Sequence, residues 1–350
     1  MCTHRPYVRP CPAPTWPSPR YVPLRLRVAP SRIIRIRASL SRIIGRVERS
    51  ASSRSVSLVT LRRVTAVRTD GFLEPGRGAG LLDVLRRRYL VKLLVRKELR
   101  VRYQGSILGL FWSYLKPAVQ FIVFYFAIGV FLGLNRNIND FAVYLFSGIV
   151  AINYFSEAFG NATRSIVGNG ALVKKIYLPR ELFPVSSLWV AIVHFFPQLL
   201  VLIVGALIAG WRPSPVQLGA GVLGFLIVTV FSLGLGLLFG AINVVFRDAE
   251  NFVDLILMVA TWISPVLYFW TNVTDAIGTG PLWWLYQANP LTAAVELFHL
   301  CFWFPATDET SPVLPNLGWI GLGALILSGL VLLLGQATFR RLERQFAQEL

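Results

Sequence analysis

The stretch FPVSSLWVAIVHFFPQLLVLIVGALIAG, residues 183–210, contains no Asp, Glu, Lys or Arg. His194 is its only titratable side chain. A helix needs roughly 20 apolar residues to cross the ~30 Å hydrocarbon core of a bilayer, so this run predicts a membrane-spanning helix. A strand of a transmembrane β-barrel would alternate polar and apolar residues, which this run does not do.

Five further apolar runs have the same character. We place six spans at about 108–133, 141–160, 183–210, 217–241, 252–270 and 317–338. The fifth is short and contains Pro265. The chain is 55% hydrophobic and 15% charged, whereas a soluble domain is about 25% charged. The sequence therefore predicts an all-α polytopic membrane protein.

The basic residues are unevenly shared among the loops. The loops at about 134–140, 211–216 and 271–316 contain only Arg136 and Arg212. The other loops and the C-terminal tail contain Arg164, Lys174, Lys175, Arg180, Arg247, Arg340, Arg341 and Arg344. Because Lys and Arg accumulate on the cytoplasmic side, we expect both termini in the cytoplasm and the loop 271–316 outside.

The outer loop 271–316 is rich in aromatic and aliphatic residues rather than polar ones. A seventh span there would place the basic tail outside. We therefore expect two short re-entrant helices, broken at Asn289–Pro290, that dip into the outer leaflet. Irregular backbone is tolerated at that depth where protein surrounds it.

Residues 1–80 form an Arg- and Pro-rich extension with sixteen arginines and three acidic residues. Three interpretations stay open for it: a disordered or membrane-surface segment with an amphipathic helix over 32–50, an organelle transit peptide, or translation that starts near residue 64 or later. A bilayer-facing tail is favoured over one that binds nucleic acid.

Residues 81–104 predict a basic amphipathic helix just before the first span. Its apolar face contains Leu82, Leu85, Tyr89 and Leu93, and its cationic stripe contains Arg88, Lys92, Arg96 and Arg100. Such a helix lies along the membrane surface and binds anionic lipid.

The sequence contains no recognisable arrangement of residues for catalysis or for ATP binding. There is no G-x-x-x-x-G-K-[ST] phosphate loop, and Cys2, Cys11 and Cys301 have no disulfide or metal spacing. Lys116, Glu157 and His194 are ionisable residues inside the spans, and a lone His such as His194 is more typical of packing than of proton transfer. We expect no catalytic residue, no metal and no cofactor on this chain.

Aromatic residues in two of the spans are candidates for lining a passage. They are Tyr114, Phe121, Phe124 and Tyr125 in the first span, and Trp262, Tyr268 and Phe269 in the fifth. Such rings also serve as interface belts and packing residues, and that interpretation stays open. An aromatic lining would suit a sliding sugar polymer, because it forms no strong directed bond.

Four motifs resemble one known family. They are VRYQGSILGLFWSYLKP (101–117), NATRSIVGNGALVKKIYLPRELFP (161–184), FRDAENFVDLILMVATWISPVLY (246–268) and NPLT (289–292). Together they resemble the ABC-2 type polysaccharide exporter permeases, whose members include Wzm and TagG. The resemblance runs from about residue 81 to 345 and leaves out residues 1–80.

The resemblance implies the permease subunit of an ATP-driven exporter of a lipid-linked cell-surface polysaccharide, such as an O-antigen, a teichoic acid or a galactan. It further implies a homodimer in the plasma (inner) membrane, with two copies of a separate ATPase that binds ATP and Mg. Thirty arginines against five lysines suggest a GC-rich genome and favour a galactan. Alternatives are an ABC-2 permease for a drug or small lipid, and a non-transporting membrane scaffold for glycan assembly.

The resemblance also implies roles for residues at three places. The ATPase-coupling residues would be Arg88, Lys92, Arg96, Leu172, Lys174, Lys175, Ile176, Arg180 and Glu181. The seven aromatic residues of the first and fifth spans would line the channel. The outer cap would contain Trp283, Trp284, Tyr286 and Trp303. Lys174 and Lys175, alternatively, only fix the topology of their loop. We expect that loop to form a short helix ended by Pro179.

Overall fold

The structure, a computed structural model, describes residues 80–133, 138–176, 178–307 and 313–350. All of them belong to one compact unit, Leu73–Leu350. The extension 1–79 lies outside the described residues, so the interpretations of it stay predictions. Within the described ranges every regular element is a helix, as expected.

Five helices of the described chain are long and apolar enough to cross a membrane. They are α4 (Trp112–Phe124) with its π-helical continuation (Tyr125–Phe131), α5 (Phe141–Gly168), α7 (Leu182–Ile208), α8 (Pro215–Val245) and α13 (Leu317–Leu342). They correspond to five of the six expected spans. The chain is thus a multi-pass membrane protein.

The expected fifth span, 252–270, is not a continuous helix. Helix α9 (Ala249–Ile263) ends in the middle of this expected span. Helix α10 (Trp270–Ile277) begins only after a six-residue break. Its 15 residues reach about 22 Å, which is short of the ~30 Å apolar core. The cause is local, because Pro265 follows Ser264 and forces it into an extended conformation at φ −79°, ψ 146°.

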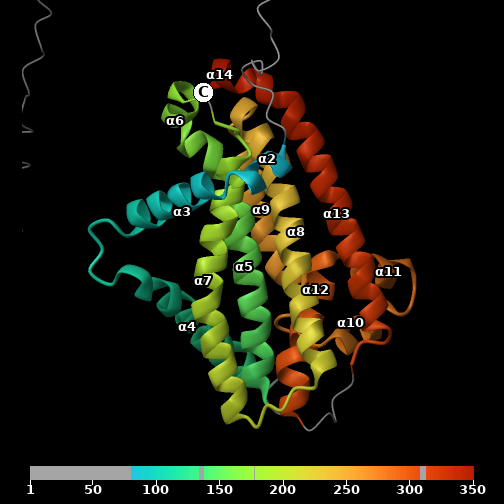
Figure 1. Cartoon of the computed structure of the whole chain (residues 1–350). Coiled ribbons are helices and arrows are strands. Elements are labelled where there is room, and N and C mark those ends of the chain that lie inside the picture. Colours follow the sequence, from blue (N-terminus) through green and yellow to red (C-terminus); the bar gives the residue numbers. More distant parts are fainter. Residues whose placement is uncertain (1–79, 134–137, 177, 308–312) are drawn as a thin grey trace, which may run out of the picture. The chain divides into compact units, whose positions relative to one another are not determined.

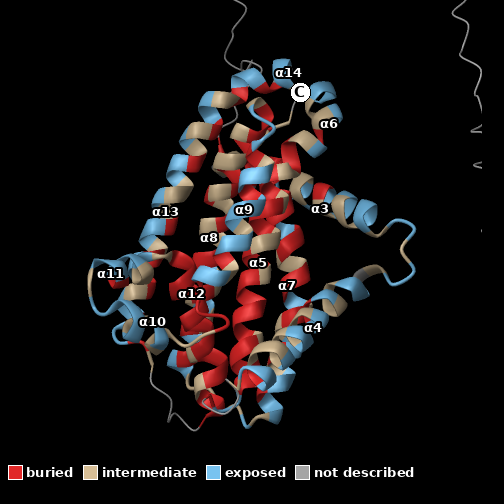
Figure 2. Ribbon diagram, turned by 180° about the vertical axis from the view of Figure 1, so that it is seen from behind, coloured by how far each residue is buried: buried red, intermediate tan, exposed pale blue. Residues whose placement is uncertain are grey.

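Helix α5 occupies the centre of the bundle, between α7, α8 and α12 (Pro290–Phe298), and Figure 2 shows it almost entirely buried. Aromatic stacking holds α5 against α8. Tyr154 stacks on Phe225 at 5.3 Å, and Phe155 stacks on Phe231 at 5.8 Å, between ring centroids. The helix continues to Gly168, eight residues beyond the expected end of the span at 160. Residues 161–168, expected in a loop, are therefore part of this helix.

Helices α8 and α13 lie against each other through glycines. A Cβ atom added at Gly234 would lie 2.7 Å from the backbone nitrogen of Leu332, and Gly335 faces the backbone of Gly234 in return. Only glycine allows two backbones to approach this closely. The pair therefore forms a rigid side of the bundle.

Three short helices follow α9. After α10 come α11 (Pro281–Ala288) and α12, whose nine residues are all buried. The expected break at Asn289–Pro290 is confirmed: the Asn289 side chain accepts a hydrogen bond from the Leu291 N–H at 3.1 Å, and Pro290 takes the first helical position. A π-helical turn (His299–Trp303) and a 3-10 turn (Phe304–Ala306) extend α12.

The expected amphipathic helix 81–104 divides at Arg87 into α2 (Leu81–Arg86) and α3 (Arg88–Tyr103). Figure 1 shows α3 and α4 leaving the bundle as the two arms of a V. In the same view α6 (Gly170–Lys175) and α14 (Phe346–Glu349) lie at the top of the molecule, above α3. Helix α6 ends at Lys175, ahead of Pro179, and Ile176 is extended, so Pro179 does not end this helix as expected.

A second apolar cluster holds these short helices on the bundle. We call it the end cluster, and its buried residues are Val84, Leu94, Ile166, Leu182, Phe183, Val185, Leu237, Ala241, Val244, Phe339 and Phe346. Its members come from α2, α3, α5, α7, α8, α13 and α14. The C-terminal helix α14 and the first described helix, α2, thereby belong to one cluster.

Candidate functional site

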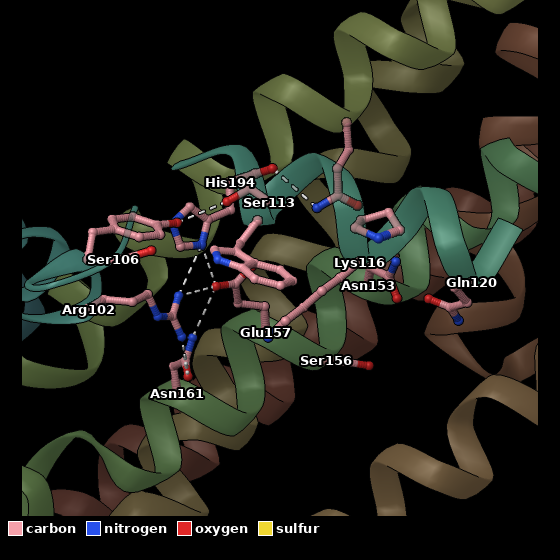
Figure 3. Close-up of a pocket in the computed structure, with 14 residues that line it drawn as sticks. Arg102, Ser106, Ser113, Lys116, Gln120, Asn153, Ser156, Glu157, Asn161 and His194 are labelled. Carbon is pink, nitrogen blue, oxygen red and sulfur yellow. Dashed lines mark hydrogen bonds and ion pairs between the residues drawn. The ribbon is translucent and has the colours of Figure 1, made fainter. Parts of the chain in front are cut away.

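A polar chamber of about 740 Å³ lies inside the V, between α3, α4, α5 and α7. Figure 3 shows the fourteen residues that line it. Most carry amide, hydroxyl or charged groups, which is unusual among helices that otherwise present aliphatic side chains. The chamber brings these polar side chains together between membrane-spanning helices, and it is our candidate site.

An ion pair between Arg102 and Glu157 crosses the chamber. Arg102 lies in the last turn of α3, while Glu157 and Asn161 lie one turn apart on the same face of α5. The guanidinium also donates to the Asn161 side-chain oxygen at 3.3 Å. The Arg102 and Glu157 side chains are 37% and 22% exposed, so the pair faces the chamber and remains accessible.

His194 of α7 joins this pair to the elbow between α3 and α4. Its Nδ1 lies 2.5 Å from Glu157 Oε1, and its Nε2 lies 2.8 Å from the Tyr103 hydroxyl, which in turn is 3.0 Å from Ser113 Oγ. The carboxylate can only accept, so Nδ1–H donates to Glu157, while Nε2 and the Tyr103 hydroxyl share a hydrogen bond that either atom can donate. His194 is buried, and both of its ring nitrogens have hydrogen-bond partners; its role in packing rather than in proton transfer stays a prediction.

We call these five side chains, Arg102, Tyr103, Ser113, Glu157 and His194, the elbow network. It connects the end of α3 and the first turns of α4 to the two central spans α5 and α7. Any change in the angle of the V must stretch or break it. The network is therefore in a position to hold one state of the α3–α4 arm.

The chamber has an excess of positive charge. Lys116 of α4 lines it and makes no ion pair or hydrogen bond with the described residues. Figure 3 places Lys116, Gln120 and Asn153 apart from the Arg102–Glu157 pair. Amides such as Asn153 and hydroxyls recognise a ligand rich in OH groups, and Lys116 adds attraction for an anion.

The aromatic residues expected to line a channel in the first span pack against α5. Phe121 lies 5.3 Å from Phe146, and Tyr125 lies 6.1 Å from Phe141, between ring centroids. Tyr114 lines an apolar cavity between α4, α5 and α7, and Phe124 is half-buried. The sequence analysis did not single out the α5 rings, Phe141 and Phe146, that these residues pack against. The spacing of aromatic residues along 141–146 was the available signal.

The aromatic residues expected in the fifth span do not share one face. Phe269 is 5.7 Å from Trp303 and 6.0 Å from Tyr144. The Tyr268 hydroxyl donates to the Ile263 carbonyl at 2.7 Å, whereas Trp262 is 61% exposed on α9. Among the described residues, rings of α5 link the two sets, and their role as a channel lining stays a prediction.

The four expected cap residues also separate into two environments. Trp283 and Trp303 are buried, and Trp283 stacks on Tyr286 at 5.6 Å. The Trp303 Nε1–H donates to the Asn139 carbonyl at 2.7 Å, which fixes the turn after α12 to the start of α5. Trp284 is exposed on α11. Three of the four thus pack inside this chain, and the cap role stays a prediction.

Most expected coupling residues lie exposed at the end of the bundle that carries α6. Arg88, Lys92 and Arg96 are exposed along α3, and Lys174, Lys175 and Ile176 are exposed at the end of α6. Leu172 is half-buried against the end cluster. A hydrogen bond from Lys97 Nζ to Asn169 Oδ1 joins α3 to the start of α6. Sequence reasoning missed this bond, which makes the two surfaces neighbours.

Arg180 and Glu181 face inward instead. Arg180 donates to the backbone carbonyl of Glu343 and lies 5.5 Å above the Phe346 ring. Glu181 is fully buried and accepts a hydrogen bond from Gln336 at 3.2 Å. These two residues hold the loop on the C-terminal segment. A direct contact with a partner would require the loop to open.

Among the described residues no three His, Cys, Asp or Glu side chains converge on a position for a metal ion. The side chains that line the candidate site are suited to noncovalent binding. Its groups offer hydrogen bonds, one excess cation and the rings of Trp112 and Tyr103.

Comparison with known proteins agrees with this picture. The ABC-2 type transporter family matches residues 89–303. The chain is 28% identical over 264 residues to the O-antigen export system permease protein RfbA of Klebsiella pneumoniae, covering 74% of this chain and 95% of the relative. It is 28% identical over 228 residues to the protein of the same name from Myxococcus xanthus, covering 65% of this chain and 85% of that relative.

A third relative is the polysialic acid transport protein KpsM of Escherichia coli, which is 21% identical over 208 residues, or 59% of this chain and 78% of the relative. The family match runs from the first turn of α3 to the turn after α12 and includes the whole polar chamber. With more than half of its residues in this match, the chain belongs to the ABC-2 type transporter family.

Proposed function

We propose that this chain is the permease subunit of an ATP-driven exporter that moves a lipid-linked cell-surface polysaccharide across the plasma (inner) membrane. The relatives named for O-antigen and polysialic acid support a polysaccharide cargo. The observation that carries the proposal is the polar chamber, because its amide and hydroxyl lining suits a hydroxyl-rich chain inside an otherwise apolar bundle.

Energy for the movement comes from a separate ATPase subunit, present in two copies, which binds ATP and Mg. The contiguous surface formed by α3 and the end of α6 is its docking site. Lys174 and Lys175 are exposed there, and Lys97 joins the two helices. A push on this surface reaches the chamber directly, since the same helix α3 ends in the elbow network.

The working unit is a homodimer with the cargo path between the two copies. Two broad apolar surfaces support this. Of the stretch Trp112–Phe131, 11% is buried in one chain. Helix α9 exposes Phe252, Leu255 and Trp262 at 63%, 56% and 61%. Rings of α4 and α9 from two copies would then face the path together.

The membrane topology that goes with this function has both termini in the cytoplasm. Helix α9 and the segment after Pro265 form the fifth of six crossings, which is interrupted, and α10–α12 are re-entrant helices on the outer side. The full burial of α12 supports this assignment, because irregular backbone at membrane depth needs protein around it.

The test is export by purified components. Permease and its ATPase are reconstituted in liposomes with the ATPase outside, lipid-linked polymer is added outside, and its protection from an added glycan hydrolase is measured. We expect protection only with ATP and both subunits. Protection of the polymer without the permease, or with an ATPase-dead partner, would contradict the proposal. So would ATP-driven uptake of a small drug with no protection of the polymer.

The coupling surface is tested in the same assay. The double variant Lys174→Glu/Lys175→Glu should insert normally and lose export, because the exposed cations are replaced by anions. The variant Arg212→Glu, an exposed arginine at the other end of α7, is the matched control and should export normally. Normal export by the double variant would refute the docking assignment, and failed insertion would show that the lysines fix topology.

A further inference from the structure

An arginine near the C-terminal end of α5 binds helix α9 through two hydrogen bonds. Arg164 Nε donates to Glu250 Oε1 at 2.5 Å, and its Nη2 donates to Asp254 Oδ1 at 2.5 Å. The two carboxylates lie one turn apart on the same face of α9. We call this arrangement the Arg164 fork. Because a guanidinium is planar and its donors point in fixed directions, the fork sets the rotation of α9 as well as its position.

The apolar contacts of α9 with the bundle constrain that rotation weakly. Its buried side chains are Ala249, Val253 and Ala260, and all three are small. The helix passes over Gly160 of α5, where an added Cβ atom would lie 3.3 Å from Leu257 Cδ1. Small residues let two helices approach closely, but they form low ridges that interlock poorly. The fork is therefore the contact that gives α9 a defined orientation on α5.

The rotation of α9 decides which side chains it exposes. Consecutive residues of a helix differ in direction by about 100°. Val253 is buried, Asp254 binds Arg164, and Leu255 is exposed. Val259 and Trp262 are exposed on the same face as Leu255. Release of the carboxylates from Arg164 would let this exposed apolar face turn.

The fork also lies close in the chain to the docking site on α3 and α6. Asn169 is the residue that joins the end of α5 to the start of α6. Its side chain accepts a hydrogen bond from Lys97 of α3 and donates through Nδ2 to the Ser165 carbonyl at 2.8 Å. Ser165 is the neighbour of Arg164 in the same continuous helix. A displacement of α3 or α6 therefore reaches Arg164 through the last turn of α5.

We propose that Arg164 is a positioning residue for export, whose fork on Glu250 and Asp254 holds α9 on α5 and carries a displacement of α3 and α6 to the exposed face of α9. The role in export rests on the proposed function, because it takes that face as a wall of the cargo path. The attachment of α9 rests on the two hydrogen bonds and the small side chains beneath the helix. In this arrangement α5 and α9 move as one body, and the fork stays closed during transport.

The first test measures polymer export and ATP hydrolysis together in the reconstituted complex. Arg164→Gln should lower the polymer exported per ATP hydrolysed about tenfold, since hydrogen bonds to charged groups are lost, while ATP hydrolysis continues. Arg164→Lys keeps the charge without the planar fork and should recover only part of the export. Arg247→Gln, at an exposed arginine two residues before α9, is the matched control and should export normally. An unchanged ratio in Arg164→Gln, or an equal loss of export and hydrolysis, would overturn the proposal.

A covalent link between the two helices separates positioning from a general loss of stability. Gly160→Cys and Leu257→Cys place two thiols at the contact of α5 with α9, where a short bifunctional thiol reagent can join them. The link should leave export unchanged, and it should restore export when Arg164→Gln is also present. Variants with one of the two cysteines, treated with the same reagent, are the controls. Export that stops on linking would show that α9 must leave α5, and a link that fails to restore export would show that holding α9 is not the role of Arg164. Either result would overturn the proposal.

The attachment of α9 is measured without ATPase or cargo. Hydrogen exchange of the full-length permease in nanodiscs should be about tenfold faster in peptides from the first half of α9 in Arg164→Gln, with α13 peptides unchanged. Equal exchange in parent and variant would overturn the attachment. Faster exchange in α9 combined with no export by the parent complex refutes the proposed function and leaves the attachment standing. Normal export by both parent and Arg164→Gln refutes only this inference.

Discussion

The contact between α8 and α13 offers a direct test of the packing. In Gly234→Ala, the new methyl group would lie 2.7 Å from the Leu332 nitrogen and 2.8 Å from its Cα. Ordinary van der Waals contact begins at 3.4 Å, and backbone cannot rotate away as a side chain can. The two helices must therefore separate by about 0.7 Å.

A gap of 0.5–1 Å forfeits about a quarter to a half of each dispersion contact. For about 50 atom pairs of about 0.15 kcal/mol each, a loss of a third is about 2.5 kcal/mol. Alanine recovers up to about 1 kcal/mol through its helix propensity. We therefore expect Gly234→Ala to destabilise the protein by about 1.5 kcal/mol or more.

The measurement is unfolding of the purified protein in mixed micelles, as the detergent fraction is raised, followed by tryptophan fluorescence. Gly323→Ala and Gly329→Ala are the controls, since a Cβ atom at either position on α13 meets no atom within 4 Å. They should be neutral or slightly stabilising. Gly335→Ala should destabilise like Gly234→Ala, because Gly335 faces the Gly234 backbone.

The double variant decides the reasoning. Once one methyl group has separated the helices, the second should add little, so the two costs should fall well short of additivity. Full additivity of Gly234→Ala and Gly335→Ala, or a stability equal to that of the Gly329→Ala control, would refute the close approach of α8 and α13.

Three further predictions concern other contacts. Arg102→Gln and Glu157→Gln should each lower the free energy of unfolding. In a double-mutant cycle, the loss in the double variant should be smaller than the sum of the two single losses by at least about 1 kcal/mol. Additive losses would contradict the ion pair. Phe346→Ala should cost about 3 kcal/mol and make the C-terminal tail sensitive to protease, while unchanged protection would mean that the tail is not packed. Trp303→Phe should cost about 1 kcal/mol through the lost hydrogen bond to the Asn139 carbonyl, whereas Trp284→Phe, on an exposed side chain, should cost almost nothing.

Hydropathy along the chain was enough to place five spans and the break before Pro290, because each feature depends on neighbouring residues. It failed at Ser264–Pro265, where Val266 and Leu267 continue the apolar run although the helix has already ended. It also failed at Gly168, since the buried end of α5 is polar enough to resemble a loop. Hydropathy averaged along the chain does not distinguish a helix that is buried inside the protein from one that faces lipid.

The candidate site could be anticipated only in part. Glu157 and His194 stood out as single polar residues in apolar spans, yet their partner Arg102 is 55 and 92 positions away in the chain. Pairing across such separations depends on helix rotation and tilt, which sequence periodicity does not provide. The available signal was the polar face formed by Asn153, Glu157 and Asn161, three residues spaced by one helical turn.

The central position of α5 has a consequence for how the protein is made. It is the least apolar of the five long helices and the most buried, so it belongs among its neighbours rather than in lipid. During synthesis α5 leaves the ribosome before α7, α8 and α12 exist, and Glu157 then has Arg102 and Asn161 as partners but not His194. Insertion of α5 should therefore depend on the α3–α4 arm at first and become secure when His194 arrives. Biogenesis of this protein is expected to need a holding factor, or a pause in synthesis, between its second and third long helices.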